Sequence, residues 1–464
     1  MNAPTALIMA AGQGTRMRSA LPKVLHEVCG RPMVAWPILA ARQAGAERVC
    51  VIVSPEHDLS AALPNGTETV VQPQADGTGG ALRAASDVIR DSGTIVVLSG
   101  DTPLLSAEAI EGLLAAHGEA GADATMMTTE LEDPGTFGRV IRSADGEVDR
   151  IVEAKKPGDA SPDQLAIREV NAGTYAFESG PLIEALGGLS NDNAQGEYYL
   201  PDLLPLIRQG GGKVIAHLVG DPAVNLGVND RADLARVADE ARRRILTAHM
   251  RAGVTIEDPG ATWIDADVEI SADTTILPGT TLRGRTSIGS GSTIGPMSTL
   301  IDSRIGERAA VLHSYLTSCQ VENEAIVGPF TYLRPDARIG EGAKAGTFVE
   351  IKNSEIGAGA KVPHLSYIGD AEVGEGSNLG ASTVTANYDG HSKYRTKIGK
   401  KVRTGVDTTL VAPVEVGDEA YTGAGSVITD DVPPGALGIS RAEQKNVEGY
   451  SRKKAEESSK DEDS

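Results

Sequence analysis

An aliphatic or small residue returns every six positions through the second half of this chain. Two series show it: Ile276, Leu282, Ile288, Ile294 and Leu300, then Ile398, Thr404, Leu410, Val416, Thr422 and Ile428. Glycine and small residues fill the intervals, as in IGSGST at 288–293. This period fits a coil with three flat faces per turn, in which each face takes one hexapeptide and the periodic side chain points inward. The pattern predicts a parallel β-helix, and the aromatic content of 3% agrees because a narrow prism has little room for rings.

The first half follows a different pattern, in which short apolar runs alternate with segments of helical periodicity. The runs at 6–9 (ALIM), 49–53 (VCVIV) and 94–101 (TIVVLSGD) are typical of buried strands, and 107–118 (AEAIEGLLAAHG) is typical of a helix. Such alternation predicts an α/β fold with a largely parallel sheet covered by helices on both sides. Ligands of these sheets bind beyond the carboxyl ends of the strands, so the turns after 6–9 and 94–101 are candidate sites.

The chain is long enough for two cores. At 464 residues it exceeds what one ordinary domain needs. We expect a first domain at 1–231, a linker helix at 232–252, the coil at 253–441 and a charged, disordered tail at 442–464. In the linker, Leu234, Val237, Ala241 and Ile245 share one helical stripe. The Arg242–Arg244 run fits the solvated face of that helix, with phosphate or partner binding as the alternative.

Charge and cysteine content exclude several functions. A net charge of -21 disfavours general binding to nucleic acid or to anionic membranes. No apolar run approaches the ~18 residues of a membrane span. The three scattered cysteines, Cys29, Cys50 and Cys319, fit reduced, buried thiols better than a disulfide framework. We therefore expect a cytoplasmic protein.

The stretch AAGQGTRMRSALPKVL at 10–25 follows the first predicted strand. Two known phosphate-binding motifs fit it poorly: Met17 stands where the third glycine of a dinucleotide fingerprint belongs, and the GK[ST] of a Walker loop is missing. Its backbone N–H groups can approach phosphates, and Arg16 and Lys23 can add positive charge to the same group. A bare glycine turn without a ligand is the alternative.

Asp101 follows the apolar run at 94–99 and so belongs to the same sheet edge. A carboxylate there suits Mg²⁺, which commonly takes one or two protein oxygens together with substrate phosphates. A turn or N-cap role for Asp101 remains the alternative.

The motifs SGD, GTG, IVEAK, NAG, NAQGEYYLPD and GVN follow the first loop in that order. With the loop, they resemble the sugar-nucleotide pyrophosphorylases. Together with the hexapeptide half, the whole chain is similar to the bacterial family of bifunctional N-acetylglucosamine-1-phosphate uridyltransferases and glucosamine-1-phosphate acetyltransferases. The resemblance implies an N-terminal Rossmann-like nucleotidyltransferase domain and a C-terminal left-handed β-helix.

The same resemblance implies roles for residues of the first domain. UDP-N-acetylglucosamine would contact Met9, Ala10, Ala11, Gly12, Lys23, Gln72, Gly77, Thr78, Gly138, Glu153, Asn171 and Asn229. Asp101 and Asn229 would hold Mg²⁺, and Arg16 and Lys23 would act on the transferring phosphoryl group. A sugar-1-phosphate oxygen is already anionic, so its attack on UTP needs charge neutralisation and alignment rather than a strong base. The family usually has His after GTG and Tyr before GD, where this chain has Gly80 and Ser99.

The coil carries a second candidate site where its repeat is interrupted. Arg334, Lys352 and Tyr367 are spaced by about one turn, which predicts a ladder on one edge of the prism. Only a neutral amine attacks a thioester, so acetylation of an amino sugar needs a base with a pKa near 7, and His364 is the candidate. A loop histidine that only stabilises the fold is the alternative.

The resemblance implies roles for the coil as well. Glucosamine phosphate would contact Arg334, Lys352, Tyr367, Asn378 and Lys393, and acetyl-CoA would contact Ala381, Asn387, Tyr388, Val406, Ala424 and Arg441. Val406 stands where the family often has Ser. Such coils pack as trimers with each acetyl site built between chains, and Lys393 would reach a neighbouring subunit.

Two other functions remain open at this point. The coil could be an allosteric or oligomerising scaffold beside a single nucleotidyltransferase, although His364 and the Asn387–Lys393 loop argue against it. The chain could also be a non-catalytic assembly subunit, although Arg16, Lys23 and Asp101 argue against that.

Overall fold

The computed structural model describes residues 3–143, 147–152, 154, 156, 158–193 and 196–461. Contacts divide the chain into two units, residues 1–245 and 246–464. The boundary lies inside the helix α8 (Arg231–Arg251), over the expected linker. In α8 the stripe residues Val237 and Ala241 are buried, as their spacing requires.

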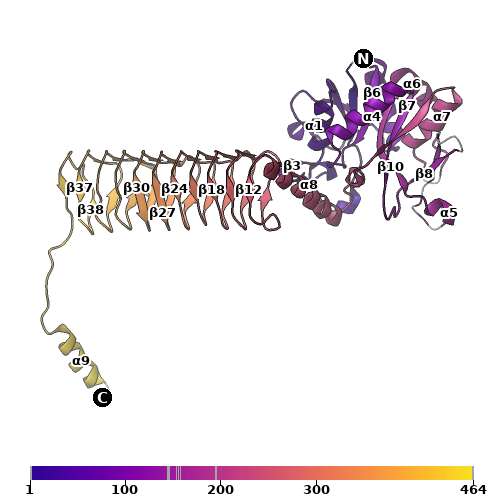
Figure 1. Ribbon diagram of the computed structural model, residues 1–464. Coiled ribbons are helices and arrows are strands. Elements are labelled where there is room, and N and C mark those ends of the chain that lie inside the picture. Colours follow the sequence, from indigo (N-terminus) through magenta and orange to yellow (C-terminus); the bar gives the residue numbers. More distant parts are fainter. Residues whose placement is uncertain are drawn as a thin grey trace. The chain divides into compact units, whose positions relative to one another are not determined.

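The first unit is built on a mixed sheet with the strand order β11-β7-β10-β6-β1-β4-β5, to which β8 and β9 add beside β10 (Figure 1). Its strands are β1 (Thr5–Met9), β2 (Glu27–Val28), β3 (Arg31–Pro32), β4 (Arg48–Val53), β5 (Glu68–Val71), β6 (Thr94–Ser99), β7 (Ala124–Glu130), β8 (Arg139–Arg142), β9 (Val148–Val152), β10 (Glu169–Glu178) and β11 (Val214–Val219). Its helices before α8 are α1 (Ala35–Gln43), α2 (Thr78–Ala84), α3 (Ser86–Arg90), α4 (Ala107–Ala120), α5 (Pro162–Leu165), α6 (Ser179–Gly188) and α7 (Leu203–Gln209).

Two hydrophobic clusters cover the two faces of this sheet. Leu7 of β1 packs with residues of α2, α3, α6 and α7, whereas Ala6 and Ile8 pack with residues of α1 and α4. Successive side chains of a strand point to opposite faces, so a strand buried on both faces must be apolar throughout. This explains the unbroken apolar runs and confirms the predicted α/β class.

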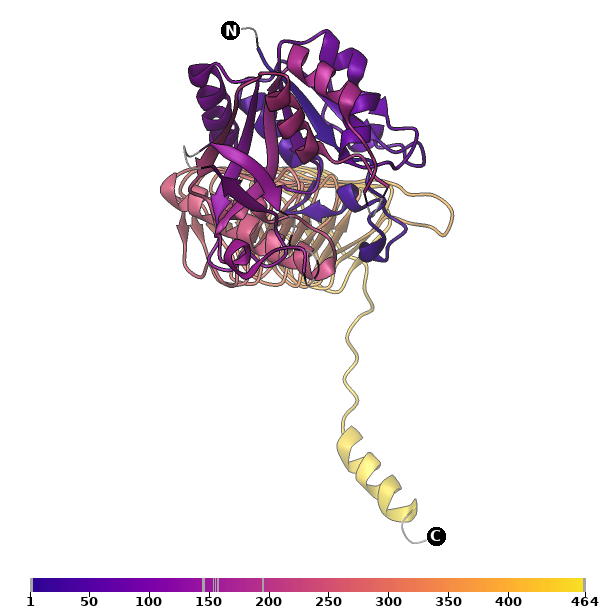
Figure 2. The same ribbon diagram turned by 90° about the vertical axis from the view of Figure 1, so that its right-hand side faces the viewer.

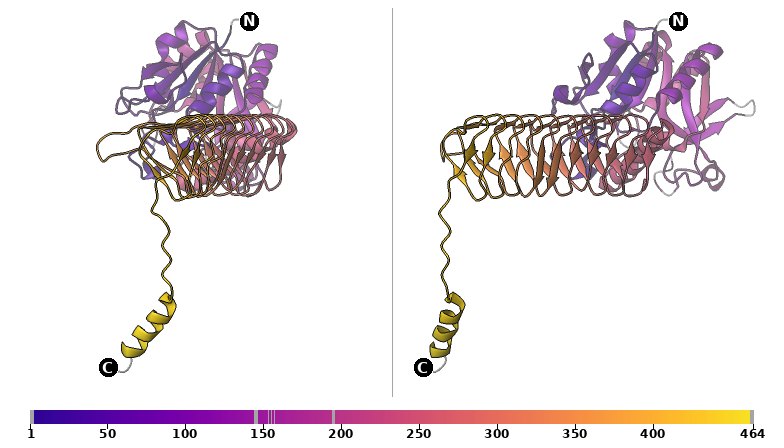
Figure 3. Two further views of the ribbon diagram at one scale, coloured as in Figure 1. Left: turned by 90° about the vertical axis from the view of Figure 1, so that its left-hand side faces the viewer. Right: turned by 60° about the vertical axis from the view of Figure 1, so that its left-hand side comes forward.

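The second unit is a β-helix of stacked coils, shown from two directions in Figure 3. Its first face contains β12 (Thr255–Ile256), β15 (Thr275–Ile276), β18 (Thr293–Ile294), β21 (Ala310–Val311), β24 (Ile326–Val327), β27 (Lys344–Thr347) and β30 (Lys361–His364). The second face contains β13 (Trp263–Ile264), β16 (Thr281–Arg283), β19 (Thr299–Ile301), β22 (Tyr315–Thr317), β25 (Tyr332–Leu333), β28 (Glu350–Lys352), β31 (Tyr367–Gly369), β33 (Val384–Ala386), β35 (Thr409–Val411) and β38 (Val427–Ile428). The third face contains β14 (Glu269–Ile270), β17 (Ser287–Ile288), β20 (Arg304–Ile305), β23 (Gln320–Val321), β26 (Arg338–Ile339), β29 (Glu355–Ile356), β32 (Ala371–Val373), β34 (Thr396–Ile398) and β36 (Val414–Val416), and the short pair β37 (Tyr421–Thr422) and β39 (Leu437–Gly438) closes the end.

The six-residue period sets the interior of the coil. Every residue of both hexapeptide series is buried, and equivalent residues stack in register, as Leu282 does with Leu300 and Leu300 with Leu316. Thr404 takes one of the inward positions although it is polar, because its buried hydroxyl accepts a hydrogen bond from Gly380 N at 2.8 Å. The predicted parallel β-helix is confirmed.

The end of the chain differs from the expected disordered tail. Residues 442–455 are exposed, and Tyr450–Asp461 form a helix, α9 (Figure 2). Lysine, glutamate and alanine favour the helical conformation even without tertiary contacts, which accounts for α9. In the described part of the chain no helix is both long enough and apolar enough to cross a membrane.

Candidate functional sites

The carboxyl ends of β1, β4, β5 and β6 lie at one edge of the first sheet, because these strands are parallel. The loop after β1 begins at this edge, where Ala10 N donates to Ile52 O at 2.9 Å and Gly100 N donates to Met9 O at 2.9 Å. The backbone of 9–12 and the turn at Asp101 are thereby held side by side, as the sequence predicts.

Lys23 packs directly beneath the glycine loop. Gly14 has φ +61, and a Cβ there would lie 2.5 Å from Lys23 Cβ, so only glycine permits this approach. Lys23 Nζ forms an ion pair with Asp101 Oδ2 at 2.5 Å, and Ser99 Oγ donates to Asp101 Oδ1 at 2.6 Å. Ser99, one of the two departures from the family pattern, therefore holds the second oxygen of Asp101.

Arg16 and Asn229 form a second polar pair at the same edge. Arg16 Nη2 donates to Asn229 Oδ1 at 2.9 Å. Val228 N donates to Asp101 O at 3.0 Å, so Asn229 is held one residue from the Asp101 backbone. The structure thus brings together Arg16 and Lys23 of the first loop, Asp101 after β6 and Asn229 before α8, which come from three different parts of the sequence.

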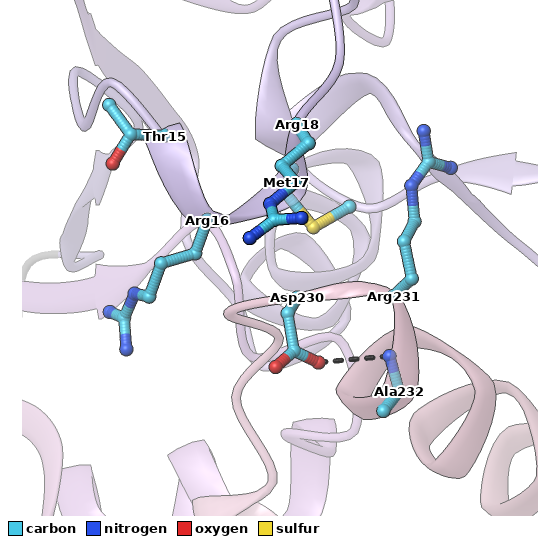
Figure 4. Close-up of a pocket in the computed structure, with 7 residues that line it drawn as sticks. All are labelled: Thr15, Arg16, Met17, Arg18, Asp230, Arg231 and Ala232. Atoms are coloured by element: carbon cyan, nitrogen blue, oxygen red, sulfur yellow. Dashed lines mark hydrogen bonds between the residues drawn. The ribbon is translucent and has the colours of Figure 1, made fainter.

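A cavity of about 720 Å³ lies beside this group, between residues 15–18 and the start of α8. Figure 4 shows the guanidinium groups of Arg16, Arg18 and Arg231 around it, with the Asp230 carboxylate at its base. Asp230 Oδ1 accepts a hydrogen bond from Ala232 N at 2.9 Å and so caps α8. With three arginines against one carboxylate, the cavity favours anions such as phosphates.

The donor set at Asp101 and Asn229 fits a divalent cation that binds mainly through substrate. One carboxylate oxygen and one amide oxygen are the hard ligands that such a cation prefers. Both already accept hydrogen bonds from cationic side chains, Asp101 from Lys23 and Asn229 from Arg16. Within the described ranges, no three His, Cys, Asp or Glu side chains gather into a metal cage. A cation here would therefore need phosphate oxygens or water to complete its coordination.

Gln72, Gly77 and Thr78 follow β5 at the same sheet edge. Gly77 has φ +98, and a Cβ there would lie 2.6 Å from Tyr198 O, so glycine is required. Thr78 Oγ1 accepts a hydrogen bond from Leu200 N at 2.9 Å. This hydrogen bond connects Leu200 to the start of α2. It therefore brings the EYYLPD motif next to the GTG motif, as a single site containing both motifs requires.

Two of the expected sugar-binding residues lie where β10 meets the start of β8. Asn171 N donates to Gly138 O at 3.1 Å, and Asn171 Nδ2 donates to Tyr175 Oη at 2.7 Å across a register shift. Gly138 and Asn171 are therefore adjacent. Glu153, the remaining expected sugar ligand, lies outside the described residues.

In the coil, Arg334 and Lys352 occupy the same column on the second face, because Leu333 pairs with Ile351 in parallel register. Arg334 Nη1 forms an ion pair with Glu350 Oε1 at 2.9 Å, and this hydrogen bond raises the pKa of Arg334. The sequence did not single out Glu350, whose only signal was its position two residues before Lys352.

Tyr367 departs from the expected ladder. It pairs with Glu350, and Lys352 pairs with Gly369, because this coil is shorter than the one before it. A Cβ at Gly369 would lie 2.4 Å from Tyr367 Oη and 2.9 Å from Asn387 Nδ2. The tyrosine ring thus reaches over Gly369 into the space next to Lys352.

Asp370 joins this cluster, although the sequence analysis did not select it. Its carboxylate accepts hydrogen bonds from Asn353 Nδ2 at 2.5 Å and from Asn387 Nδ2. Burial alone would raise the pKa of Asp370, but these hydrogen bonds and the nearby Lys352 and Lys393 charges outweigh it and lower the pKa. In the sequence Asp370 is only a single acidic residue after Gly369, and no motif distinguishes it from other acidic residues of the coil.

Lys393 lies on the loop that interrupts the coil, visible as the projecting loop in Figure 3. Hydrogen bonding to Lys352 and the positive charge of Lys352 lower the pKa of Lys393. In this single chain Lys393 lies near its own Lys352 and Asp370, and its service to a neighbouring subunit stays a prediction. The short Asn387–Asp370 contact draws the base of the loop back onto its own coil.

His364 is the last residue of β30, whereas Asp370 directly follows β31. Its imidazole makes no hydrogen bond to a described residue, and the side chain is exposed. Four residues separate Leu365 from Asp370, so the Asp370 corner lies at the other end of the second face of this coil from the corner that carries His364.

Four of the six residues that the resemblance implied for the acetyl donor lie together. Asp407 N donates to Ala381 O at 2.8 Å, and Gly425 N donates to Val406 O at 2.8 Å. Ser382 N donates to His364 O at 3.3 Å in the same way. Successive coils therefore stack in one column His364, Ala381, Val406 and Ala424, and Arg441 Nη1 donates to Ala424 O at 3.1 Å.

The other expected coil residues flank this column. Asn378 forms bridges with Lys361 and Arg403 on the first face, three residues before Ala381. Tyr388 is 59% exposed on the projecting loop, and its hydroxyl donates to Gly390 O at 2.6 Å.

The architecture and both polar clusters define a class: a nucleotidyltransferase joined to a β-helix of the acyltransferase type. The MobA-like NTP transferase domain family matches residues 6–249. Bifunctional protein GlmU of Mycolicibacterium gilvum is 49% identical over 98% of this chain and 93% of its own length. Bifunctional protein GlmU of Mycobacterium tuberculosis is 48% identical over 97% of this chain and 92% of its own length.

This chain therefore belongs to the bifunctional GlmU family, as the sequence motifs predicted. It is a bifunctional transferase of UDP-N-acetylglucosamine synthesis, with uridyltransferase and acetyltransferase activities.

Proposed function

We propose that the coil transfers an acetyl group from acetyl-CoA to glucosamine-1-phosphate, and that the first unit then transfers uridylyl from UTP to the acetylated sugar phosphate. Pyrophosphate and UDP-N-acetylglucosamine are the final products. The observation that carries this proposal is the pair of separate polar clusters, one around Lys23 and Asp101 and one around Lys352 and Asp370.

In the uridylyl site, the sugar phosphate oxygen attacks the α-phosphorus of UTP and pyrophosphate leaves. Arg16 and Lys23 stabilise the charge that spreads over the phosphoryl oxygens, which is the main task in phosphoryl transfer. Gln72, Gly77 and Thr78 bind the base, and Gly138, Glu153 and Asn171 bind the amino sugar. The contacts of Lys23 with Asp101 and of Arg16 with Asn229 support these roles, since they hold both cations at the sheet edge.

We assign the divalent cation to Mg²⁺ on Asp101 and Asn229. When bound, Mg²⁺ neutralises and orients the phosphates of UTP. Lys23 and Arg16 then move from these two side chains to the phosphates, and Ser99 keeps Asp101 oriented through the hydrogen bond to Oδ1.

In the acetyl site, His364 removes the proton from the sugar amine as the amine attacks the thioester carbonyl, and CoA leaves as the thiol. Arg334, Lys352, Tyr367, Asn378 and Lys393 bind the sugar phosphate. Asn387 and Tyr388 complete the acetyl-CoA site. The stacking of His364 with Ala381, Val406 and Ala424 supports this assignment, because it puts the base beside the column assigned to the donor.

We further propose a homotrimer with acetyl sites shared between chains. The corner between the first and second faces carries a column formed by Met297, His313, Phe330, Phe348 and Leu365. Met297 is 68% exposed, Phe348 is 59% exposed and Leu365 is 58% exposed, and the rings of Phe330 and Phe348 stack at 5.4 Å. Such a contiguous apolar column is typical of an interface.

A second copy of the chain is the occupant that explains this column best. The column ends at Leu365, directly beside His364, so a coil packed on it would approach the exposed base. The cation cluster of a neighbouring chain could then lie beside His364. Because the substrates UTP and acetyl-CoA are cytosolic metabolites, we propose a cytoplasmic location.

Paired variants test the two-site proposal. His364→Ala should lower CoA release from acetyl-CoA and glucosamine-1-phosphate at least about 100-fold, with pyrophosphate release unchanged. Asp101→Asn should lower pyrophosphate release by at least about 100-fold, with CoA release unchanged. The assays supply glucosamine-1-phosphate and acetyl-CoA, or N-acetylglucosamine-1-phosphate, UTP and Mg²⁺, so each half is measured alone. Equal loss of both activities in either variant would contradict separate sites.

A further inference from the structure

The side-chain amide of Gln72 is held in one orientation. Gln72 is 6% exposed at the end of β5. Its Nε2 donates to Asp76 Oδ1 at 2.8 Å and to Gly77 O at 3.1 Å. A side-chain amide nitrogen carries two hydrogens, and these two bonds use both of them.

Both partners of Nε2 can only accept hydrogen bonds. A carboxylate and a backbone carbonyl offer no proton, so turning the amide over would set its oxygen against two other oxygens. Oε1 therefore remains the group that Gln72 offers to a ligand, and no described residue donates a hydrogen bond to it. An acceptor in this position selects a ligand that presents an N–H.

Gly80 provides the space for the Asp76 carboxylate. A Cβ at position 80 would lie 1.9 Å from Asp76 Oδ1 and 2.3 Å from its Cγ. Gly80 lies inside α2, where alanine is the more favourable helical residue, so the helix itself does not require glycine. Gly80, which stands where the family usually has histidine, thus leaves room for the Asp76 carboxylate that accepts a hydrogen bond from Gln72.

We propose that Asp76, accommodated by Gly80, is a positioning residue that makes Gln72 select uracil over cytosine. The imide N–H of uracil can donate to Oε1, whereas the equivalent ring nitrogen of cytosine has no proton. This inference rests on the proposed role of Gln72 in base binding. It extends that role to two residues outside the expected contact set.

Steady-state kinetics of pyrophosphate release with UTP and CTP test the proposal. Asp76→Leu removes the acceptor at similar volume and should raise the KM for UTP about tenfold, the worth of one hydrogen bond to a charged group, with kcat within about twofold. The preference for UTP over CTP in kcat/KM should fall by a similar factor. Asp76→Asn should stay close to the wild type, because its amide oxygen accepts the same hydrogen bond.

Gly80→Ala tests the same contact from the other side. The Cβ of the new alanine displaces the Asp76 carboxylate, so Gly80→Ala should raise the KM for UTP as Asp76→Leu does. The double variant should have a KM for UTP no higher than that of the single variant with the higher KM. Additive losses in the double variant would overturn the proposal. Asp91→Asn is the charge-matched control, because Asp91 precedes β6 at the other end of the sheet, and it should leave both nucleotides unaffected.

The outcomes separate this proposal from the function itself. A wild-type protein that releases no pyrophosphate from UTP would refute the proposed function. A functional wild type together with an Asp76→Leu variant of unchanged KM and unchanged UTP preference would refute the positioning role alone. Loss of kcat without a change in KM would also refute it. Thermal unfolding checks that each variant is folded, and Gly80→Ala provides the test if Asp76→Leu is not.

Discussion

The charged side chains at the uridylyl site neutralise one another before substrate arrives. Lys23 and Asp101 have side-chain exposures of 14% and 24%, and leaving either charge alone at this depth would cost free energy. The ion pair holds both charged side chains at the sheet edge, where a substrate phosphate can take the place of Asp101 as the partner of Lys23. The same holds for Arg16 and the polar oxygen of Asn229.

Substitution of this single side chain, Lys23→Met, should lower kcat/KM for pyrophosphate release about 100-fold or more, because it removes a fixed cation from the transferring phosphoryl group. Release of CoA should not change. Lys213→Met, which removes an equal charge just before β11, is the control and should keep both activities. Retention of full uridylyl transfer by Lys23→Met would contradict the assignment.

Helix α8 shows how an element resolves an ambiguous charge pattern. The Arg242–Arg244 run is neither a phosphate site nor simply solvated. Arg242 pairs with Asp239, Arg243 pairs with Glu240, and Arg244 reaches both Glu240 and Asp221. Hydrogen bonds from Arg243 first, opposed by burial and reinforced by Arg244, lower the pKa of Glu240 to about 2.

The Glu240 contacts predict a pH-dependent contribution to stability. A carboxyl whose folded pKa is lowered contributes stability above its unfolded pKa and loses it as pH falls toward the folded pKa. Glu240→Gln should therefore reduce the free energy of unfolding by about 1–2 kcal/mol at pH 7, since the contacts are partly solvated. The difference from the wild type should shrink between pH 4.5 and about pH 2. Urea unfolding at several pH values measures it, and a pH-independent difference would contradict this account.

The whole molecule combines two units whose chemistry depends on assembly in different degrees. The polar groups of the uridylyl site come from one sheet edge within residues 1–245. In the proposed acetyl site, His364 is exposed at the end of β30, next to Leu365 of the apolar corner column. We therefore expect only the acetyl activity to require the trimer.

Phe348→Asp tests this dependence, because it inserts a charge into the apolar corner column. We expect it to dissociate the trimer in sedimentation experiments, to lower CoA release at least about tenfold since part of the interface energy of a central aromatic is lost, and to leave pyrophosphate release intact. Met250→Asp, the same kind of change outside the column, should remain trimeric. A trimeric, fully active Phe348→Asp variant would contradict a shared acetyl site.

The sequence determined the two folds and the residue types of both sites. Apolar runs buried on both faces specify the sheet, and an inward residue at every sixth position specifies the coil, because both are local periodicities that any stretch of chain expresses. Family motifs selected Lys23, Asp101, His364 and the residues expected to bind acetyl-CoA, and these roles stay predictions.

Only the tertiary structure decided which side chains meet. Coils of unequal length moved Tyr367 out of the Arg334–Lys352 column, and Asn387 donates a hydrogen bond to Asp370, which no motif had marked. Neither Asp76 beside Gly80 nor Ser99 on Asp101 belongs to a periodic pattern. Such contacts depend on the path of the backbone between distant or turning segments, and a local pattern carries no information about that path.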